Sequence, residues 1–261
     1  MAEPTVHVKL VDQPGRRRVA HVTVANEQRL NCLTSRQNIR IEETFKALAK
    51  DDALAAVVLT GAGAKAFIGG ADLNELGQAD PETARLYITR LHKACKAIRA
   101  CPAPVIGRVN GFTLGAGLEV AAACDFRVAA DQAVFGMPEV HMGLPSVIEA
   151  ALLPGLIGWG KTREILITGE TFGAAEALAM GLVEKVVPAA DLDAAVGHWL
   201  QAILRAAPAA IRSQKALIDR WQRSSVEEGI LAGIDALSDA YRTGEPQAAI
   251  AGFFASKTKK R

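Results

Sequence analysis

Apolar and polar residues alternate near the start of the chain, and an apolar run follows further on. Residues 5–11 and 19–24 alternate with a period of two, which is typical of half-buried strands. The Asp-Gln-Pro-Gly link between them, residues 12–15, favours a turn, so the two strands are predicted to form a hairpin. Residues 55–60 are almost wholly apolar, which predicts a strand buried on both faces, as in a parallel sheet.

Two helices in the first half of the chain have clear start signals. Thr34, with Gln37 three residues later, resembles a capping box, and the apolar residues that follow as far as Leu48 fit one helical face. The sequence Asp80-Pro81-Glu82 combines a cap, a proline in the first turn and an early acid. We therefore expect a second helix that runs to about Ala100, just before two prolines.

The pattern after residue 100 first mixes both kinds of element and then becomes helical. Short strands are predicted at residues 103–109, 125–130, 133–135 and 183–187. Helices are predicted among them at about 146–156, 161–167 and 174–179. Further helices, without strands, are predicted at about 191–206, 208–222, 225–240 and 246–256. The fold class is therefore α/β, with a core domain at residues 1–195 and a helical region at residues 196–261.

Residues 110–125 combine the end of a strand, a glycine turn and a helix of small residues. Gly115 and Gly117 let the backbone approach a ligand closely, and the free N–H groups of a helix's first turn favour negative charge. Glu119 lies a few residues inside this helix. Donors for an oxyanion beside a carboxylate suit proton transfer next to a carbonyl group. A tightly packed turn with a solvated Glu119 would show the same pattern.

Composition excludes some classes of partner. The 261 residues carry a net charge of +2, which predicts neither a nucleic-acid binder nor a membrane-surface protein. Neither a membrane-spanning run nor a leader-like segment is recognisable, so we expect a cytoplasmic protein. The cysteines lack metal-type spacing, and we interpret them as thiols of a reducing compartment. They are Cys32, Cys95, Cys101 and Cys124.

Several segments occur together in one order and spacing. They are residues 66–73 (Ala-Phe-Ile-Gly-Gly-Ala-Asp-Leu), residues 110–125, Pro138-Glu139, Thr168-Gly169-Glu170 with Ala175-Glu176-Ala177, and Gly181-Leu182-Val183. In this arrangement the chain resembles the crotonase superfamily, the enoyl-CoA hydratase/isomerase family, over essentially its whole length. The resemblance implies a spiral of ββα turns followed by a C-terminal helical trimerisation region, and hence a homotrimer or a dimer of trimers. It also implies an acyl-CoA thioester as substrate, without a metal or redox cofactor.

The resemblance also implies catalytic groups. Two backbone N–H groups hold the thioester oxygen as it becomes an enolate, and by position they belong to Ala71 and Ala116. Hydratases of the family use two glutamates, which match Glu119 and Glu139 here, and the two acids favour hydration of a 2-enoyl-CoA. One carboxylate takes a proton from water and the other is placed to deliver a proton to the α-carbon. How these roles divide between the glutamates is open at this point.

Other reactions of the family remain as alternatives. These are enoyl- or dienoyl-CoA isomerisation and thioester hydrolysis, and a non-catalytic RNA-binding or scaffold relative is a more distant alternative. The segment at residues 141–153, which contains the loop at residues 143–149, is one residue shorter than the corresponding glycine-rich segment of many hydratases. Glu149 in this loop is a third acid, expected to face solvent or an ion pair; a position in the pocket would favour an isomerase or a hydrolase. Ser146 is expected to be a helix N-cap rather than a nucleophile.

Substrate contacts are carried over by position. Asp72 is also expected to cap the following helix, and Asp125 to accept a backbone hydrogen bond. Basic groups near the front of the chain and in the last helix are candidates for the phosphate charges. The CoA-binding candidates are Arg29, Asn31, Cys32, Leu33, Ala66, Gly70, Asp72, Leu73, Gly115, Leu144 and Lys257.

Overall fold

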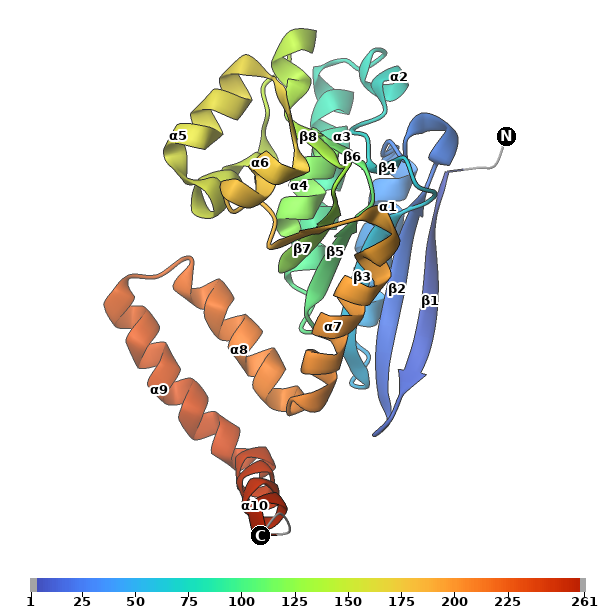
Figure 1. Cartoon of the computed structure of the whole chain (residues 1–261). Coiled ribbons are helices and arrows are strands. Elements are labelled where there is room, and N and C mark those ends of the chain that lie inside the picture. Colours follow the sequence, from blue (N-terminus) through green and yellow to red (C-terminus); the bar gives the residue numbers. More distant parts are fainter. Residues whose placement is uncertain (1–3, 259–261) are drawn as a thin grey trace.

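The computed structural model describes residues 4–258, with side chains as far as residue 255, and contains two β-sheets (Figure 1). Within the described range the larger sheet has the strand order β1-β2-β3-β5-β7-β10. Its strands are β1 (Thr5–Gln13), β2 (Arg17–Ala25), β3 (Leu54–Gly61), β5 (Val105–Val109), β7 (Phe126–Ala130) and β10 (Lys185–Val187). The predicted hairpin of β1 and β2 is confirmed, and every other neighbouring pair is parallel.

The smaller sheet is interleaved with the larger one along the chain. Its order is β4-β6-β8-β9, from β4 (Ala66–Ile68), β6 (Phe112–Leu114), β8 (Val134–Gly136) and β9 (Thr171–Gly173). Each of β3, β5 and β7 in the larger sheet is followed by a strand of the smaller sheet, and then by a helical segment. This repetition is the predicted spiral of ββα turns, and it confirms the α/β fold class.

The larger sheet is covered by helices on both faces. Helices α1 (Ser35–Leu48), α3 (Pro81–Arg99) and α4 (Ala116–Ala123) share one buried apolar cluster with Val57 and Leu59 of β3. Ala56 and Val58, the alternate residues of the same strand, belong to a second cluster with helix α7 (Leu192–Arg205). Successive side chains of a strand point to opposite faces, so β3 is buried on both, as predicted.

The capping sequences predicted the starts of two helices correctly. Thr34 and Asp80 each form a capping box with the residue three positions later, so both predicted helix starts are confirmed. The predicted helix at residues 146–156 is wrong. Residues Ile148–Leu152 form a 3-10 turn, η3, and helix α5 (Leu153–Thr168) follows with a kink at Gly158, which has a φ of 73°.

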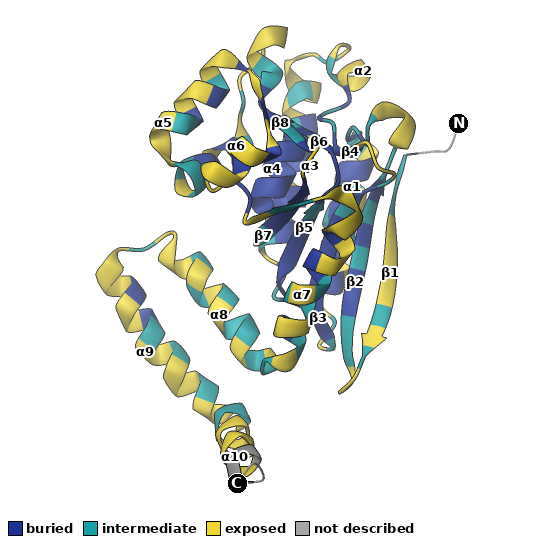
Figure 2. Cartoon of the chain, viewed as in Figure 1, coloured by how far each residue is buried: buried dark blue, intermediate teal, exposed yellow. Residues whose placement is uncertain are grey.

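The chain ends in helices α7, α8 (Pro208–Trp221), α9 (Val226–Arg242) and α10 (Glu245–Thr258), close to the predicted bounds. Figure 2 shows that α8 to α10 are largely exposed and that α9 and α10 lie away from the core. Helix α7, in contrast, crosses the predicted division near residue 195 and packs on the larger sheet, and that division stays a prediction. Among the described residues, no helix is long and apolar enough to cross a membrane.

Candidate active site

Helix α4 begins in the core, directly after β6. Gly115 makes the turn with a φ of 51°, a conformation that side chains other than glycine rarely adopt. All residues of α4 are buried. A Cβ on Gly117 would lie 1.9 Å from the carbonyl oxygen of Ile68, so only glycine lets the start of α4 lie against the end of β4.

Two backbone N–H groups are free where these segments meet. Ala71 forms a parallel bridge to Leu33, in which the Leu33 N–H donates to Gly70 and the Asp72 N–H donates to Leu33, so the Ala71 N–H is not used. Ala116 is the first residue of α4, where a helix leaves its N–H without an acceptor. Neither N–H donates to an acceptor among the described residues.

The two predicted acids meet at the same place. Glu119 lies in the first turn of α4 with 4% of its surface exposed, and its Oε1 accepts the N–H of Ala150 at 3.3 Å. Glu139 comes from η2 (Pro138–Met142), the 3-10 turn after β8. A Cβ on Gly115 would lie 2.3 Å from its Oε1, so the Glu139 carboxyl lies over the turn that starts α4. Ser146 donates to its Oε2 at 3.0 Å.

The free N–H groups and the acids occupy corresponding places in three successive turns of the spiral. Ala71 follows β4, Ala116 and Glu119 follow β6, and Glu139 follows β8. Because β4, β6 and β8 are parallel neighbours in the smaller sheet, their C-terminal ends lie along one edge. The fold therefore brings together residues that are far apart in the sequence.

The site changes the protonation of Glu119. Burial and, to a smaller extent, the negative charge of Glu139 raise the pKa of Glu119 to about 8, against the opposing effect of the Ala150 hydrogen bond. At neutral pH the Glu119 carboxyl therefore holds a proton. Two carboxyl groups that share one proton can serve as acid and base in one reaction.

This protonation makes the stability of the protein depend on pH. The folded chain keeps the Glu119 proton up to about pH 8, whereas the unfolded chain loses it near pH 4.5. The contribution of this proton to the stability of the fold is therefore complete below pH 4.5 and is lost as the pH rises through 8. Glu119→Gln carries no such proton. We expect its free energy of unfolding, relative to wild type, to rise by about 1 kcal/mol per pH unit between pH 5 and 8 and then to level off.

Urea unfolding of both proteins at four pH values between 5.5 and 8.5 measures this difference. Glu164→Gln on α5 is the control, because Glu164 is exposed and pairs with Lys161 away from the site. A difference between Glu119→Gln and wild type that does not change with pH would show that Glu119 is not protonated in the folded protein.

A cavity of about 390 Å³ opens beside the free N–H groups. It lies between the loop around Arg29, the end of β4, the start of α2 (Leu73–Leu76) and the turn η2. The predicted site residues that line it are Arg29, Cys32, Gly70, Ala71, Asp72, Leu73, Gly115, Glu139 and Leu144. The structure thus gathers most of the predicted substrate contacts around one space.

Some predicted contacts lie elsewhere. Asn31 is fully buried, and its side-chain amide donates to the carbonyl groups of Ala62 and Ala66. Leu33 is part of the apolar core and Ala66 is buried in β4. These three side chains therefore support the cavity wall from behind and do not line it. Lys257 falls in α10, but its side chain lies outside the described residues.

The acid at the cavity wall, Asp72, has the predicted capping role. Its Oδ1 accepts the N–H groups of Asn74 and Glu75 and so caps α2, which confirms that prediction. Its other oxygen binds Arg29 Nη1 at 3.1 Å. Asp72 is 4% exposed and Arg29 is 52% exposed, so the guanidinium is anchored at one end and open to the cavity at the other.

The two predictions for the loop at residues 143–149 have different outcomes. Ser146 is not an N-cap, because η3 begins after Val147 without a side-chain cap, and its hydroxyl binds Glu139 instead. Glu149 does not face solvent, because it is 3% exposed, but the ion pair expected as the other possibility is present: its Oε1 lies 3.0 Å from Nδ1 of His92 on α3. His92 was not singled out from the sequence. In the sequence, only its position next to the apolar Leu91, which is buried in α3, indicated that His92 could lie near the core.

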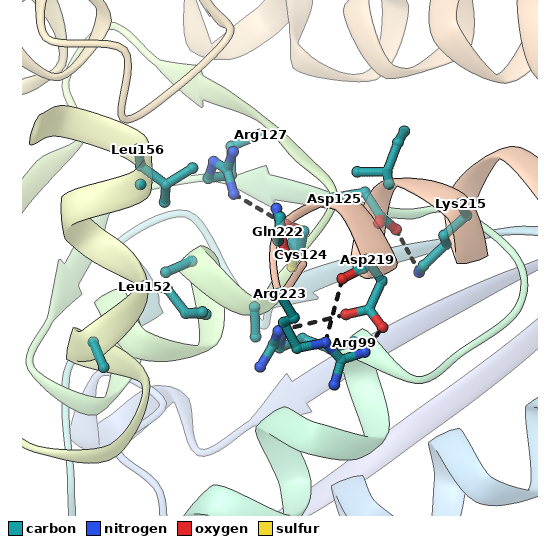
Figure 3. A pocket seen from close by; sticks show the side chains of 15 residues that line it. Arg99, Cys124, Asp125, Arg127, Leu152, Leu156, Lys215, Asp219, Gln222 and Arg223 are labelled. Atoms are coloured by element: carbon teal, nitrogen blue, oxygen red, sulfur yellow. Dashed lines mark hydrogen bonds and ion pairs between the residues drawn. The ribbon is translucent and has the colours of Figure 1, made fainter. Parts of the chain in front are cut away.

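A second cavity, of about 520 Å³, lies between α8 and the core (Figure 3). Ion pairs line it: Lys215 Nζ lies 2.6 Å from Asp125 Oδ2, and Arg99 Nη2 lies 3.6 Å from Asp219 Oδ1. Asp125 also accepts the N–H of Val105 at 2.6 Å, the backbone hydrogen bond predicted for it. The ion pairs around this cavity attach α8 to the core.

Among the described residues, no cluster of histidine, cysteine or acidic side chains could hold a metal ion. A sequence model of the enoyl-CoA hydratase/isomerase family matches residues 15–259. The short-chain-enoyl-CoA hydratase of Clostridium acetobutylicum is 32% identical over 237 residues, which cover 90% of this chain and 91% of that protein. The crotonyl-CoA hydratase of Syntrophomonas wolfei is 31% identical with the same coverage.

Comparison with solved structures indicates the same family. The crystal structure of enoyl-CoA hydratase from Bacillus anthracis matches with a TM-score of 0.90 and 28% identity, over 95% of this chain and 96% of that chain. The chain therefore belongs to the enoyl-CoA hydratase/isomerase family and is an enzyme of that family. An acyl-CoA substrate is consistent with this membership.

Proposed function

We propose that this enzyme adds water to a 2-enoyl-CoA and forms a 3-hydroxyacyl-CoA. The observation that carries the proposal is the meeting of Glu119 and Glu139 at the start of α4, beside the free N–H groups of Ala71 and Ala116. The relatives named as a short-chain-enoyl-CoA hydratase and a crotonyl-CoA hydratase support the same reaction.

The site contains a group for each change of charge. In the proposed reaction the thioester oxygen gains negative charge as water adds to the β-carbon, and the N–H groups of Ala71 and Ala116 would hold that oxygen. The water forms a C–O bond and gives up one proton to the ionised carboxyl of the pair. The protonated carboxyl gives its proton to the α-carbon, where a C–H bond forms. The two glutamates together therefore gain one proton from water and lose one to the substrate.

The cavity would take the CoA side of the substrate. Arg29, held by Asp72, offers an exposed guanidinium at the mouth, where it can bind a phosphate. Leu73 and Leu144 provide apolar contacts. Lys257 stays a candidate for a phosphate contact, and a second copy of the chain would be one way to bring it there. We also propose that no metal or redox cofactor takes part.

A panel of acyl-CoA thioesters tests the proposed function. The wild-type protein should lower the absorbance of crotonyl-CoA or a longer 2-enoyl-CoA, because hydration removes the conjugated double bond. Mass spectrometry should show the gain of one water. A product of unchanged mass from a 3-enoyl- or dienoyl-CoA, or the release of free CoA, would show isomerisation or hydrolysis and contradict the proposal.

We propose, in addition, that the chain forms trimers through its last helices. Helix α9 exposes apolar side chains that a soluble monomer rarely leaves uncovered: Val226 is 82% exposed, Ile234 62% and Leu237 64%. We expect light scattering to give three or six times the 27.6 kDa of one chain. Leu237→Asp should lower this mass and Asp235→Asn, on the same helix, should not; a monomeric wild type would rule the assembly out.

A further inference from the structure

A third carboxyl group lies buried next to the proposed acid pair. Glu149 is 3% exposed, and its Oε2 is buried without a hydrogen-bond partner among the described residues. A buried carboxyl with one oxygen unpaired is costly, so it needs an explanation beyond packing. Like Glu119, Glu149 is not among the residues that line the cavity.

Glu149 is fixed from both sides. Its Oε1 binds His92 on α3, and the next residue, Ala150, donates its N–H to Glu119 on α4. The residue just before these contacts is strained, because Ile148 has a φ of 38°, which β-branched residues rarely adopt. Tertiary contacts must hold such a conformation, and the His92 bond and the Ala150 bond are contacts of that kind.

Burial and the neighbouring charges act on Glu149 in opposite directions. Burial, the largest effect, raises the pKa of Glu149 above its usual value, and His92 and Arg99 on α3 oppose this shift and stabilise the ionised form. The thiol of Cys95, also on α3, stays neutral because burial raises its pKa. On α4 the facing group is Glu119, and the negative charge of Glu149 acts on it in the same direction as that of Glu139.

We propose that Glu149 is a positioning residue that acts on Glu119: its buried negative charge, fixed in place by His92, keeps the proton on Glu119. Glu149 takes no part in bond making. It makes the pair hold a proton over a wider pH range than Glu139 alone would allow. The catalytic meaning of that proton rests on the proposed function, but its retention on Glu119 does not.

Glu149→Gln tests the proposal, because the amide keeps the shape of the side chain and a hydrogen bond to His92 but loses the charge. The free energy of unfolding is measured with and without Glu119→Gln, once in the wild-type background and once in the Glu149→Gln background. The readout is the pH at which the difference between the two members of each pair levels off. We expect this pH to fall by about half a unit or more when Glu149→Gln is present in both. Glu164→Gln, the same change at an exposed position on α5, should leave it unchanged.

A kinetic measurement extends the test. If the enzyme hydrates 2-enoyl-CoA, Glu149→Gln should move the alkaline limb of the kcat profile to lower pH by the same amount and leave KM within about two-fold. An unchanged levelling pH in the unfolding data overturns the proposal, whatever reaction the enzyme catalyses. An absence of hydration by the wild type, with the levelling pH shifted, overturns the proposed function and supports the role of Glu149.

Discussion

Glu119→Gln and Glu139→Gln should each lower kcat for the hydration of a 2-enoyl-CoA by about 10³-fold, with KM changed by much less. Each amide keeps the shape of the carboxyl group but cannot exchange a proton, and general acid–base catalysis by one group typically contributes 10²–10⁴-fold. An assay that follows the loss of the conjugated enoyl group, and that can detect roughly 10⁻³ of the wild-type rate, measures both variants.

The double variant makes this prediction sharper. If the two carboxyls work as one unit, the variant with both changes should be about as slow as either single variant, because the losses are not additive. Glu75→Gln, near the same cavity but outside the acid pair, is a matched control and should stay within about three-fold of wild type. Two folded single variants with wild-type kcat would remove the acid pair from the mechanism.

Ala116→Pro should lower kcat by roughly 10²–10³-fold, because it removes the N–H proposed to hold the thioester oxygen. The change is unusually clean here. Ala116 is the first residue of α4, where proline is tolerated because that N–H has no helical acceptor. Gly115, with a φ of 51° and a ψ of −119°, has no Cβ to clash with the proline ring.

Ala116→Gly is the control for this variant, because it removes a methyl group but keeps the N–H. We expect it to retain kcat within about ten-fold, even if the extra backbone freedom lowers stability by up to 1 kcal/mol. Circular dichroism confirms that both proteins are folded. A folded Ala116→Pro enzyme with the kcat of Ala116→Gly would show that this N–H does not stabilise the reaction.

Local signals were enough to predict much of the fold. The capping boxes at Thr34 and Asp80 involve residues three positions apart, and the apolar run of β3 follows from its burial on both faces. The capping role of Asp72 is local in the same way. In each case the partner is close in the sequence, so one short stretch contains the whole interaction.

The missed contacts join distant parts of the chain. His92 and Glu149 are 57 residues apart, and neither stretch shows that α3 and η3 pack together. The helix predicted at residues 146–156 failed for a related reason: Ile148 takes a positive φ that its own sequence disfavours, and tertiary contacts hold it. The resemblance to the family supplied positions for Glu119 and Glu139, but it could not supply the burial that raises the pKa of Glu119.

The spiral also has a consequence for how such a protein diverges. Each ββα turn places one short corner at the site, after β4, β6 or β8, while the strands and helices that hold the corner are shared with the core. A change at the β8 corner, which carries Glu139, therefore leaves intact the corners with the free N–H groups of Ala71 and Ala116, which we propose hold the thioester oxygen. New reactions on the same class of thioester can arise by replacing one corner at a time, without rebuilding the scaffold.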